Sequence, residues 1–430
     1  MNPIRVIADF HIHSRFSRAT SQQMSITEIT RFAKIKGLKL VGTGDFTHPE
    51  WFNELSKELT EVSGTNLYGS KNHPESPVRY MITAEVCTIF SFDEKTKKIH
   101  HVILTPSLET ATQISDRLKR YGSLSVDGRP TLDMTAPQLV EEVMQVSDEN
   151  EVIPAHVWTP WFSLFGAFSG FDRIEDCYQD MTNHIHALET GLSSDPPMNW
   201  RLSALDKFTL VSNSDCHSHW PWRIGREANV LELDRLTYRE VVDTIRKKDP
   251  KRFKYTIETN PSYGKYHWSG HRKCNVSLPP QEAMKYGNHC PVCGRKLTRG
   301  VDQRIEELAD RPADYTPENP IGYKRLLPLS EIIKAVVDVS YPGAKKVWSI
   351  YTPLIKKFGD EYTVLIDAPK QEMEKIVDLR IAEAIVRVRE EKAKVIPGYD
   401  GVYGQLVIFD QEQEDSAQHK PQQRSMADFM

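Results

Sequence analysis

The chain has 430 residues, with 55 Lys and Arg against 59 Asp and Glu, so its formal net charge is −4. Its 39% hydrophobic and 27% charged residues suffice for a buried core, which excludes disordered and collagen-like proteins. No apolar run approaches the ~18 residues of a membrane helix, and residues 1–13 are too polar for a signal peptide. We therefore expect a cytoplasmic protein with no membrane partner, and the balanced charge leaves DNA binding open.

Short apolar runs alternate with helical patterns between residues 4 and 257, which is typical of an α/β barrel. In the first unit a strand is predicted over 4–12, and Ser25 with Glu28 forms a capping box before a helix that ends at Gly37. The other predicted strands lie at 38–41, 80–90, 101–104, 152–154, 187–189 and 209–212, and the helices at 108–121, 137–145 and 238–247. We expect one barrel domain over residues 1–260.

The pattern changes after Pro261. A cysteine-rich stretch at 261–300 is followed by a predicted helical C-terminal domain at 301–409, with helices over 301–308, 329–337 and 371–394. Residues 410–430 are rich in Gln, Glu, Asp and Ser, a composition typical of a flexible tail. The loop 398–404 is rich in glycine and tyrosine, and the sequence leaves open whether it contacts DNA or forms a tight turn.

Metal-ligating residue types recur where the predicted strands end. His11 and His13 are two apart, so on a strand both imidazoles lie on the same face. The other candidates are Asp45, Glu85, His101, His156, Asp215 and His217. The carboxyl ends of barrel strands meet at one face, so we expect these side chains to converge, although a structural role stays open for single members such as His48, His100 and Asp45.

Imidazoles with carboxylates suit Zn, Mn, Mg or Fe, and a carboxylate such as Glu85 is able to bridge two ions. A pair of ions activates water and clamps the attacking and leaving oxygens of a phosphoester. The sequence therefore predicts two or three divalent metals and hydrolysis of phosphoesters, with Asp215, Glu85 and His156 as catalytic residues.

This arrangement resembles the polymerase-and-histidinol-phosphatase (PHP) family, whose members carry a distorted TIM-like (βα)7 barrel with up to three metals. The resemblance covers residues 1–257. It implies one cluster of His11, His13, Glu85 and Asp215, a second site with His101 and His156 sharing Glu85, and a third with His217.

Two positions depart from the PHP pattern. Asp45 is followed by Phe46, where many relatives have a histidine, and Ser17 lies near the place of another histidine. Both departures concern the third site.

A second set of predicted metal ligands lies within one short stretch of the chain. His271-x2-Cys274 and Cys290-x2-Cys293 have the spacing of a closed, tetrahedral structural Zn site, with His267 and His289 as spare ligands. A chance Cys-x2-Cys beside unrelated histidines is the alternative. The surrounding basic residues favour contact with a phosphate backbone, although each alone is equally consistent with a solvated face: Lys265, Arg272, Lys273, Lys285, Arg295, Lys296 and Arg299.

The end of the chain, Gln423-x2-Met426-x2-Phe429-Met430, resembles a PIP peptide. Such peptides dock the DNA sliding clamp PCNA, with the glutamine in a polar pocket and the apolar residues as a plug. Met430 stands where a second aromatic residue is usual, and a chance match is the alternative.

Barrel, zinc module, helical region and clamp peptide, in this order, resemble the endonuclease Q family of archaeal DNA-repair nucleases. The resemblance implies incision on the 5′ side of uracil, hypoxanthine, xanthine or an abasic site, with damaged DNA and PCNA as partners. The alternatives are a PHP-family phosphatase, a 3′ exonuclease and a non-enzymatic scaffold bound to the clamp.

A nuclease that inspects a base takes it out of the stack, so it needs aromatic residues and a pocket near the metals. Aromatic candidates on the loops after His156 and His217 are Trp158, Trp161, Phe162, Phe165, Phe168, Trp220 and Trp222, for which core packing is the alternative. Deamination replaces an amine with a carbonyl, so we expect hydrogen-bond donors in the pocket. Asn213 and the turn from Gly191 to Ser193 are the candidates.

Overall fold

The computed structural model describes residues 3–409, and its main body is an 11-stranded mixed sheet. Strand β1 (Ile4–Asp9) pairs in parallel with β2 (Leu40–Gly42) and antiparallel with β11 (Ala228–Leu233). Strand β1 is shorter than the predicted 4–12, because the chain leaves the sheet at Phe10, and Ile12 then forms an isolated bridge with Cys216, outside the strands of the sheet. This departure frees the segment that carries the two histidines.

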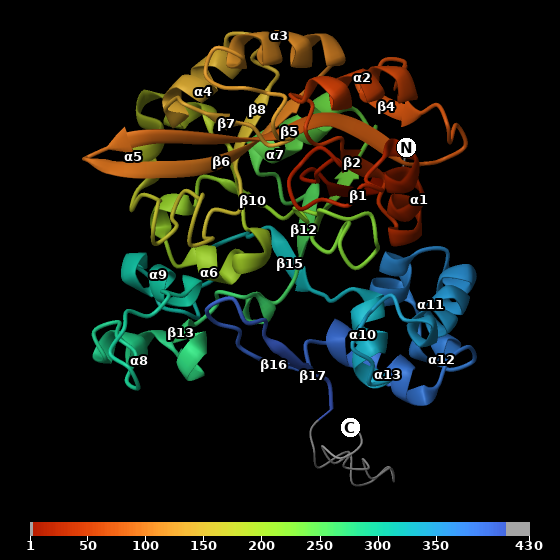
Figure 1. The fold of residues 1–430 in the computed structure, drawn as a ribbon. Helices are drawn as coiled ribbons and strands as arrows, with labels where there is room; N and C mark the ends of the chain where they lie inside the picture. The colour runs from red at the N-terminus through yellow and green to blue at the C-terminus, as the bar shows by residue number, and fades with distance from the viewer. Residues whose placement is uncertain (1–2, 410–430) are drawn as a thin grey trace, which may run out of the picture.

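Strands β5 (Arg79–Phe92) and β6 (Lys95–Thr105) form a long antiparallel hairpin that projects beyond the rest of the sheet (Figure 1). Its turn is Asp93–Glu94, both with positive φ, a conformation that short polar side chains tolerate better than branched ones. Strand β5 is parallel to β2, and β6 is antiparallel to β8 (Glu151–Pro154). The sheet is therefore mixed, whereas a regular strand–helix alternation would make it parallel.

The remaining strands extend this sheet or pair beside it. The sheet also contains β3 (Leu59–Val62), β4 (Leu67–Ser70), β7 (Thr131–Leu132), β12 (Phe253–Glu258) and β15 (Gly322–Arg325). A separate parallel pair consists of β9 (Ala187–Glu189) and β10 (Thr209–Val211). The strands of both sheets are largely buried, so their polar residues must find partners inside the protein.

Helices surround the strands, as Figure 1 shows. They are α1 (Ile26–Lys36), α2 (Pro49–Glu58), α3 (Leu108–Leu118), α4 (Ala136–Met144), α5 (Ile174–Tyr178), α6 (Pro196–Trp200) and α7 (Tyr238–Lys247). Helix α1 begins and ends as predicted: the Ser25 side chain accepts a hydrogen bond from the Glu28 N–H, and Gly37 closes the helix in the left-handed conformation. The second half of the predicted capping box does not form, because the Ser25 N–H donates to Gln23 O instead of the Glu28 side chain. The Glu28 carboxylate lies 3.6 Å from Arg31.

A small lobe follows the main sheet. It contains β13 (Ser269–His271), β14 (Val276–Leu278), α8 (Pro280–Lys285) and α9 (Val301–Leu308), and Val276, Ala283, Cys290 and Leu297 form its own core. We call this part the zinc lobe. Strand β15 pairs with β12 of the main sheet, so residues 322–325 do not belong to the helical domain predicted for 301–409.

The helical domain consists of α10 (Leu329–Val336), α11 (Lys345–Phe358), α12 (Lys370–Met373) and α13 (Leu379–Arg389). The single helix predicted over 371–394 is wrong. Asp378 accepts a hydrogen bond from the Arg380 N–H and starts a new helix there, and Lys394–Ile396 forms β16, which pairs with β17 (Gln405–Val407). Helix α11 was not predicted, since Pro353 inside it weakens the helical signal.

A buried ion pair fastens the helical domain to helix α1 beside the main sheet. Lys36 Nζ lies 2.7 Å from Glu361 Oε1, and the two side chains are 1% and 0% exposed. The hydroxyl of Tyr351 and the N–H of Leu329 also donate to the Glu361 carboxylate, so this charge is fully compensated. The helical domain and the main sheet region therefore share one continuous buried network.

The loop 398–404 is a structural turn. Asp400 accepts hydrogen bonds from the Arg272 N–H at 2.7 Å and the Thr298 hydroxyl at 2.6 Å, and Gly398 O accepts one from the Trp268 N–H. A Cβ atom at Gly398 would lie 2.2 Å from Gly264 O, so only glycine fits. The loop therefore ties the zinc lobe to the strand pair β16–β17, with only part of its surface exposed.

Among residues 3–409, no helix is both long and apolar enough to cross a membrane. The predicted clamp-binding residues Gln423, Met426, Phe429 and Met430 lie outside the described residues.

Candidate metal centre

The predicted first cluster is brought together: ligand atoms of His11, His13, Glu85 and Asp215 lie within 4.8 Å of one another. His13 Nε2 lies 3.1 Å from Asp215 Oδ1 and 3.2 Å from Glu85 Oε2. The two histidines follow β1, Glu85 lies within β5, and Asp215 follows β10, so three separate strands build the cluster.

Each imidazole of this cluster is oriented by a carboxylate. His11 Nδ1 lies 3.0 Å from Glu189 Oε1, and His13 Nδ1 lies 3.0 Å from Asp45 Oδ1. His11 Nε2 is buried and has no hydrogen-bond partner in the part of the chain that the structure describes, and it faces Glu85 Oε2 at 3.4 Å. A carboxylate on one ring nitrogen and an open second nitrogen are typical of metal-ligating histidines. The donor set therefore fits a divalent metal.

A second group of ligand atoms comes from Glu85, His100 and His156. Glu85 Oε1 lies 2.8 Å from His100 Nδ1 and 3.1 Å from His156 Nε2, whereas Oε2 faces His11 and His13. One carboxylate thus offers one oxygen to each group. If each group held a divalent metal, Glu85 would be a ligand of both.

The prediction that His101 belongs to the second group is wrong, and His100 takes its place. Both ring nitrogens of His101 are occupied, by the Tyr178 hydroxyl at 2.9 Å and the Thr88 hydroxyl at 3.0 Å. In the hairpin register His100 opposes Cys87, which shares a face with Glu85, whereas His101 opposes Val86 on the other face. Burial lowers the pKa of His101 to about 3, so this imidazole is neutral.

Asp45 and His217 lie beside the ligand groups without being members of them. Asp45 orients His13 and accepts hydrogen bonds from the Ser14 N–H and the Ser17 hydroxyl. The ring of His217 lies 4.4 Å from that of His13, and its Nδ1 lies 3.1 Å from Asp215 O. The third site therefore stays a prediction.

Glu189 and Arg129 belong to the centre, although neither was predicted from the sequence as a site residue. Glu189 binds His11 and also accepts hydrogen bonds from the His156 N–H at 2.7 Å and the Asn213 side chain at 2.8 Å. An acidic residue at the end of a buried strand was the available signal. The Arg129 guanidinium lies 3.2 Å from Glu85 Oε2, and nothing in its local sequence indicates this contact.

The charges of the centre shift its titrating groups strongly. Burial lowers the pKa of His11, but Glu189, Glu85 and Asp215 outweigh this effect and raise the pKa well above its ordinary value. Burial raises the pKa of Glu85, but His100, Arg129 and His11 outweigh it and hold the pKa well below the usual range. Carboxylates kept ionised around an imidazole that favours positive charge create a potential suited to a cation.

Three residues at the centre have left-handed backbone conformations: Asp45 (φ 50°), His156 (φ 31°) and Asp215 (φ 46°). Such strain in non-glycine residues gathers at functional sites. Gly191 also has a positive φ, and a Cβ atom there would lie 2.6 Å from the Cβ of His156. The turn η2 (Gly191–Ser193) therefore packs directly against a ligand residue.

The structure corrects two of the predicted base-contacting residues. Asn213 is 1% exposed, accepts hydrogen bonds from the Phe10 N–H and the Asn229 side chain, and donates to Glu189, so it has a structural role. Trp158 is fully buried and donates to Asn199, so it belongs to the core.

Trp161 and Phe168, two of the aromatic candidates, are exposed, so core packing does not account for them. Trp161 is 41% exposed, Phe168 is 50% exposed, and their rings stack at 5.0 Å. Ser193, at the end of η2, is half-buried. Base contact by Trp161, Gly191 and Ser193 stays a prediction.

The zinc lobe brings together its predicted ligands. The donor atoms of His271, Cys274, Cys290 and Cys293 lie within 4.8 Å of one another, and Cys293 Sγ lies 3.4 Å from His271 Nδ1. Burial raises the pKa of Cys290, but the backbone N–H groups of Cys293 and Val292 outweigh it and lower the pKa to about 6. N–H groups aimed at a sulfur favour the thiolate that Zn binds, so this set also fits its metal.

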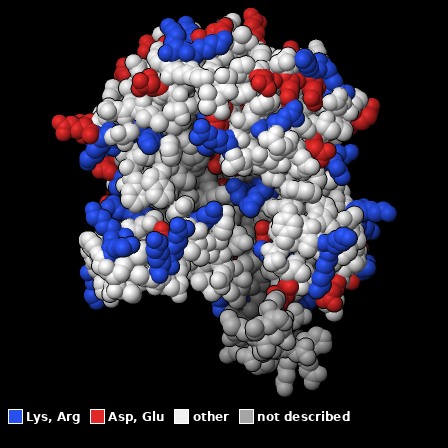
Figure 2. Space-filling model, viewed as in Figure 1, with Lys and Arg blue, Asp and Glu red and all other residues white. Residues whose placement is uncertain are grey.

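The surface around the zinc lobe is rich in Lys and Arg, and a hollow lies between this lobe and the helical domain (Figure 2). Of the predicted basic residues Arg272, Lys273, Lys285, Arg295 and Lys296 are exposed.

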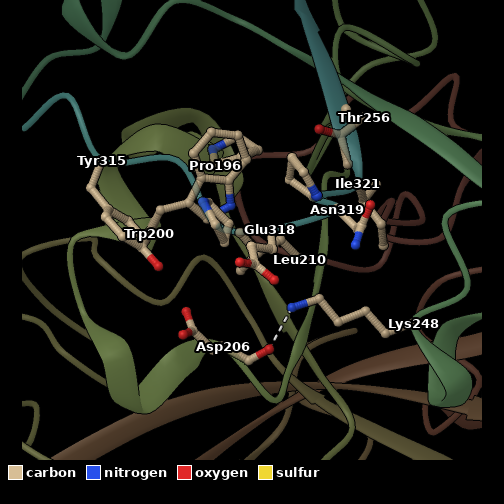
Figure 3. A pocket seen from close by; sticks show the side chains of 13 residues that line it. Pro196, Trp200, Asp206, Leu210, Lys248, Thr256, Tyr315, Glu318, Asn319 and Ile321 are labelled. Carbon is tan, nitrogen blue, oxygen red and sulfur yellow. Dashed lines mark hydrogen bonds between the residues drawn. The ribbon is translucent and has the colours of Figure 1, made fainter.

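A separate cavity of about 360 Å³ is shown in Figure 3. Trp200, Leu210, Lys248, Thr256 and Tyr315 contribute to its lining, and Lys248 Nζ donates to Asp206 O. None of its lining residues belongs to the ligand groups found among residues 3–409, so it is distinct from the metal centre.

Two solved structures align with nearly the whole chain. The lesion-specific endonuclease PfuEndoQ from Pyrococcus furiosus is 32% identical with a TM-score of 0.84, and the alignment covers 97% of this chain and 100% of that one. Endonuclease Q in complex with a 27-mer duplex that has an abasic lesion at the active site is 32% identical with a TM-score of 0.83, over 95% of this chain and 98% of that one.

Two sequence relatives and one domain family also match. Protein MJ0043 of Methanocaldococcus jannaschii is 34% identical over 270 residues, which are 61% of this chain and 33% of that protein. Protein YqxK of Bacillus subtilis is 26% identical over 417 residues, 94% of this chain and 99% of that protein. The family model of the MJ0043 C-terminal domain matches residues 328–392, which contain α10 to α13. The chain thus spans about a third of the M. jannaschii protein.

Proposed function

Because the chain belongs to the endonuclease Q family, we propose that it is a DNA-repair endonuclease that cuts the phosphodiester bond on the 5′ side of a lesion. The observation that carries the proposal is the Glu85 carboxylate, which faces one ligand group with each oxygen. The related structure with an abasic duplex supports the substrate class. The proposed lesions are abasic sites and the deaminated bases uracil, hypoxanthine and xanthine.

We assign the first metal position to His11, His13, Glu85 and Asp215 and the second to Glu85, His100 and His156, on a PHP-type (βα)7 barrel. When bound there, divalent ions supply a water nucleophile and neutralise charge on the phosphate. The residues of the chain set the geometry: Glu189 and Asp45 hold the imidazoles in place through their second nitrogens.

Asp215 is the part of the centre that substrate reaches. Its side chain is 29% exposed, whereas Glu85 and the two histidines are 0–1% exposed. The Arg129 side chain is 26% exposed and lies beside Glu85, so its guanidinium is available to a phosphate oxygen. We assign to Asp215 the handling of a proton during hydrolysis, and to Arg129 the binding of the phosphate.

The DNA is proposed to cross the hollow of Figure 2, with the basic surface of the zinc lobe on its backbone. Five exposed Lys and Arg residues on that lobe suit the sequence-independent attraction of phosphates. The zinc ion is proposed to keep this lobe folded. PCNA is the proposed partner of the terminal residues Gln423, Met426, Phe429 and Met430.

The test uses end-labelled duplexes with a single abasic site, uracil or hypoxanthine, beside an undamaged duplex, incubated with Mn, Mg or Zn. We expect one cut on the 5′ side of the lesion, absent from the undamaged duplex and lost in Asp215→Ala. Trimming of intact ends, or hydrolysis of phosphomonoesters alone, would reject the endonuclease and favour an exonuclease or a phosphatase.

A further inference from the structure

The helical domain contacts a turn over residues 221–225 that lies between the metal centre and strand β11. Lys36, whose ammonium is paired with an acid of the helical domain, donates to Pro221 O at 2.8 Å. Tyr362, a residue of the helical domain that is 2% exposed, donates its hydroxyl to Gly225 O. The helical domain therefore holds this turn at both ends.

The same turn holds the residue that precedes the metal ligand Asp215. The Gly225 N–H donates to Asp9 Oδ2 at 3.0 Å, and the Ser214 N–H donates to Asp9 Oδ1 at 3.1 Å. Arg226, which directly follows the turn, donates through Nη2 to Ser214 O at 2.9 Å. Both main-chain groups of Ser214 are therefore connected to the turn, one through Asp9 and one through Arg226.

Asp215 has a backbone conformation that requires such support. Its φ is 46°, a left-handed value that a non-glycine residue keeps only where its surroundings hold it. Its carboxylate belongs to the first ligand group, so a shift of this backbone moves a ligand atom. Asp9 is fully buried, and its Oδ1 also accepts from the His11 N–H at 3.4 Å. One carboxylate thus contacts two segments that carry ligands.

We propose, as a step that rests on the proposed function and deepens it, that Tyr362 of the helical domain is a positioning residue of the metal centre. Its hydroxyl fixes Gly225, whose N–H fixes Asp9, and Asp9 holds Ser214 and thereby the strained backbone of Asp215. An ionised carboxylate only accepts hydrogen bonds, so Asp9 suits the N–H donors on both of its oxygens. Loss of the Tyr362 contact would therefore loosen the ligand Asp215 and weaken metal binding.

The test is Tyr362→Phe, which keeps the ring and removes the hydroxyl. Tyr238→Phe is the matched control, because Tyr238 is also 2% exposed and its hydroxyl also donates to main-chain oxygens, those of Leu104 and Glu149. Binding of Mn²⁺ to the whole chain, with zinc in the zinc lobe, is measured by electron paramagnetic resonance without DNA. Thermal unfolding and incision at an abasic site are measured on the same preparations.

We expect Tyr362→Phe to weaken, by about three- to tenfold, the Mn²⁺ binding that Asp215→Ala abolishes. This loss is smaller than the roughly 10–100-fold loss for a group that touches a metal ligand directly. Tyr238→Phe should lower the unfolding temperature by a similar amount and leave Mn²⁺ binding unchanged. A lower unfolding temperature of Tyr362→Phe with unchanged Mn²⁺ affinity would make Tyr362 a purely structural residue and overturn the proposal.

Asp9→Asn tests the path between Tyr362 and the ligand. The amide places an NH₂ group where the carboxylate accepts, so the N–H of Gly225 or Ser214 then faces a donor. We expect Mn²⁺ affinity to fall about tenfold or more, with no further loss when Tyr362→Phe is added. Additive losses would overturn the path through Asp9.

Two outcomes separate this inference from the proposed function. If Tyr362→Phe weakens Mn²⁺ binding as expected but no preparation cuts damaged DNA, the proposed endonuclease fails while the positioning role stands. If the parent protein cuts damaged DNA and Tyr362→Phe binds Mn²⁺ as tightly as the parent, the positioning role fails alone. Should Asp9→Asn not fold, the comparison of Tyr362→Phe with Tyr238→Phe still decides.

Discussion

The two metal-binding regions of this molecule differ in how the chain builds them. The ligands of the zinc lobe come from residues 271–293, within one small set of turns, whereas those of the barrel centre come from positions between 11 and 215. Cysteines dominate the first region, and histidines with buried carboxylates make up the second.

The difference lies in what surrounds the ligands. In the zinc lobe the ligands are part of the small core that they hold together, since Cys290 packs with Val276, Ala283 and Leu297. The ligands of the barrel centre instead come from strands and from the segments that follow them, and Glu189 and Asp45 orient two of the imidazoles through their second ring nitrogens. We therefore expect a metal in the lobe to support folding and metals in the barrel centre to serve chemistry.

The largest expected effect tests the assignment of the second barrel group. We predict that His100→Gln lowers incision at an abasic site about a hundredfold or more, because it removes one side chain of the second ligand group and leaves only Glu85 and His156. His101→Gln should leave kcat nearly unchanged and lower stability by about 1–3 kcal/mol, through its lost contacts to Tyr178 and Thr88. Steady-state kinetics and thermal unfolding distinguish the two variants, and the reverse pattern would restore His101 as the ligand.

A smaller effect tests the carboxylate behind the first group. Glu189→Gln keeps the shape of the side chain but removes the charge that orients His11 Nδ1. We predict a loss of about 10–100-fold in kcat/KM, with weaker metal binding and an unchanged fold, as found for groups that orient metal-ligating histidines. Metal titration followed by incision is the measurement. Activity equal to that of the unmodified protein would mean that His11 does not need the Glu189 carboxylate to hold its ring in place.

Removal of a cysteine ligand from the zinc lobe should weaken the binding of DNA and leave the rate of incision nearly unchanged. We predict that Cys290→Ser abolishes zinc binding by the lobe and weakens affinity for duplex DNA, while kcat at saturating DNA changes less than threefold, by roughly 0.6 kcal/mol or less. Elemental analysis and fluorescence polarisation check the first two effects. A collapse of kcat with DNA saturating would show that the two regions are not separable.

The last prediction concerns stability instead of activity, and a buried carboxylate that has no histidine beside it. Burial and the nearby Asp195 raise the pKa of Glu258 to about 8, above its unfolded value of 4.5. Its protonated form therefore contributes stability that is complete below about pH 4.5 and is lost as pH rises through 8. We predict that Glu258→Gln, which stays neutral, is more stable than the parent by a few kcal/mol at pH 8.5, at about 1.4 kcal/mol per pKa unit.

Thermal unfolding at pH 5 and pH 8.5 measures this difference. The stabilisation by Glu258→Gln should appear only at the higher pH. An equal difference in stability between Glu258→Gln and the parent at both pH values would mean that the carboxyl of Glu258 is ionised in the folded protein, as the metal-facing carboxylates are.

The sequence predicted the parts that depend on local pattern. The helix from Ile26 to Lys36 and the spacing of the zinc ligands were evident, because a cap, a glycine and a short loop determine them. The choice between His100 and His101 depends on the register of a hairpin, and a shift of one residue exchanges the two faces.

The remaining misses have a different cause. Arg129 reaches Glu85 from a loop 44 positions away, and no periodic pattern describes such a contact. Asn213 has the amide donor that a base pocket needs, but it donates to Glu189, and its amide oxygen already accepts from the Phe10 N–H, which lies 203 positions away. Such roles follow from the packing of the folded chain, which a linear pattern does not contain.

The ion pair of Lys36 with Glu361 limits which helical domains are able to replace the present one. The helical domain is matched by a family model of its own, so it is a defined unit that could be exchanged for the same domain of a relative. A barrel that received a domain without the acid at position 361 would leave a buried ammonium unpaired, at a cost of about 3–5 kcal/mol. Lys36 and Glu361 therefore constrain recombination: the two positions must change together, although 325 positions separate them in the chain.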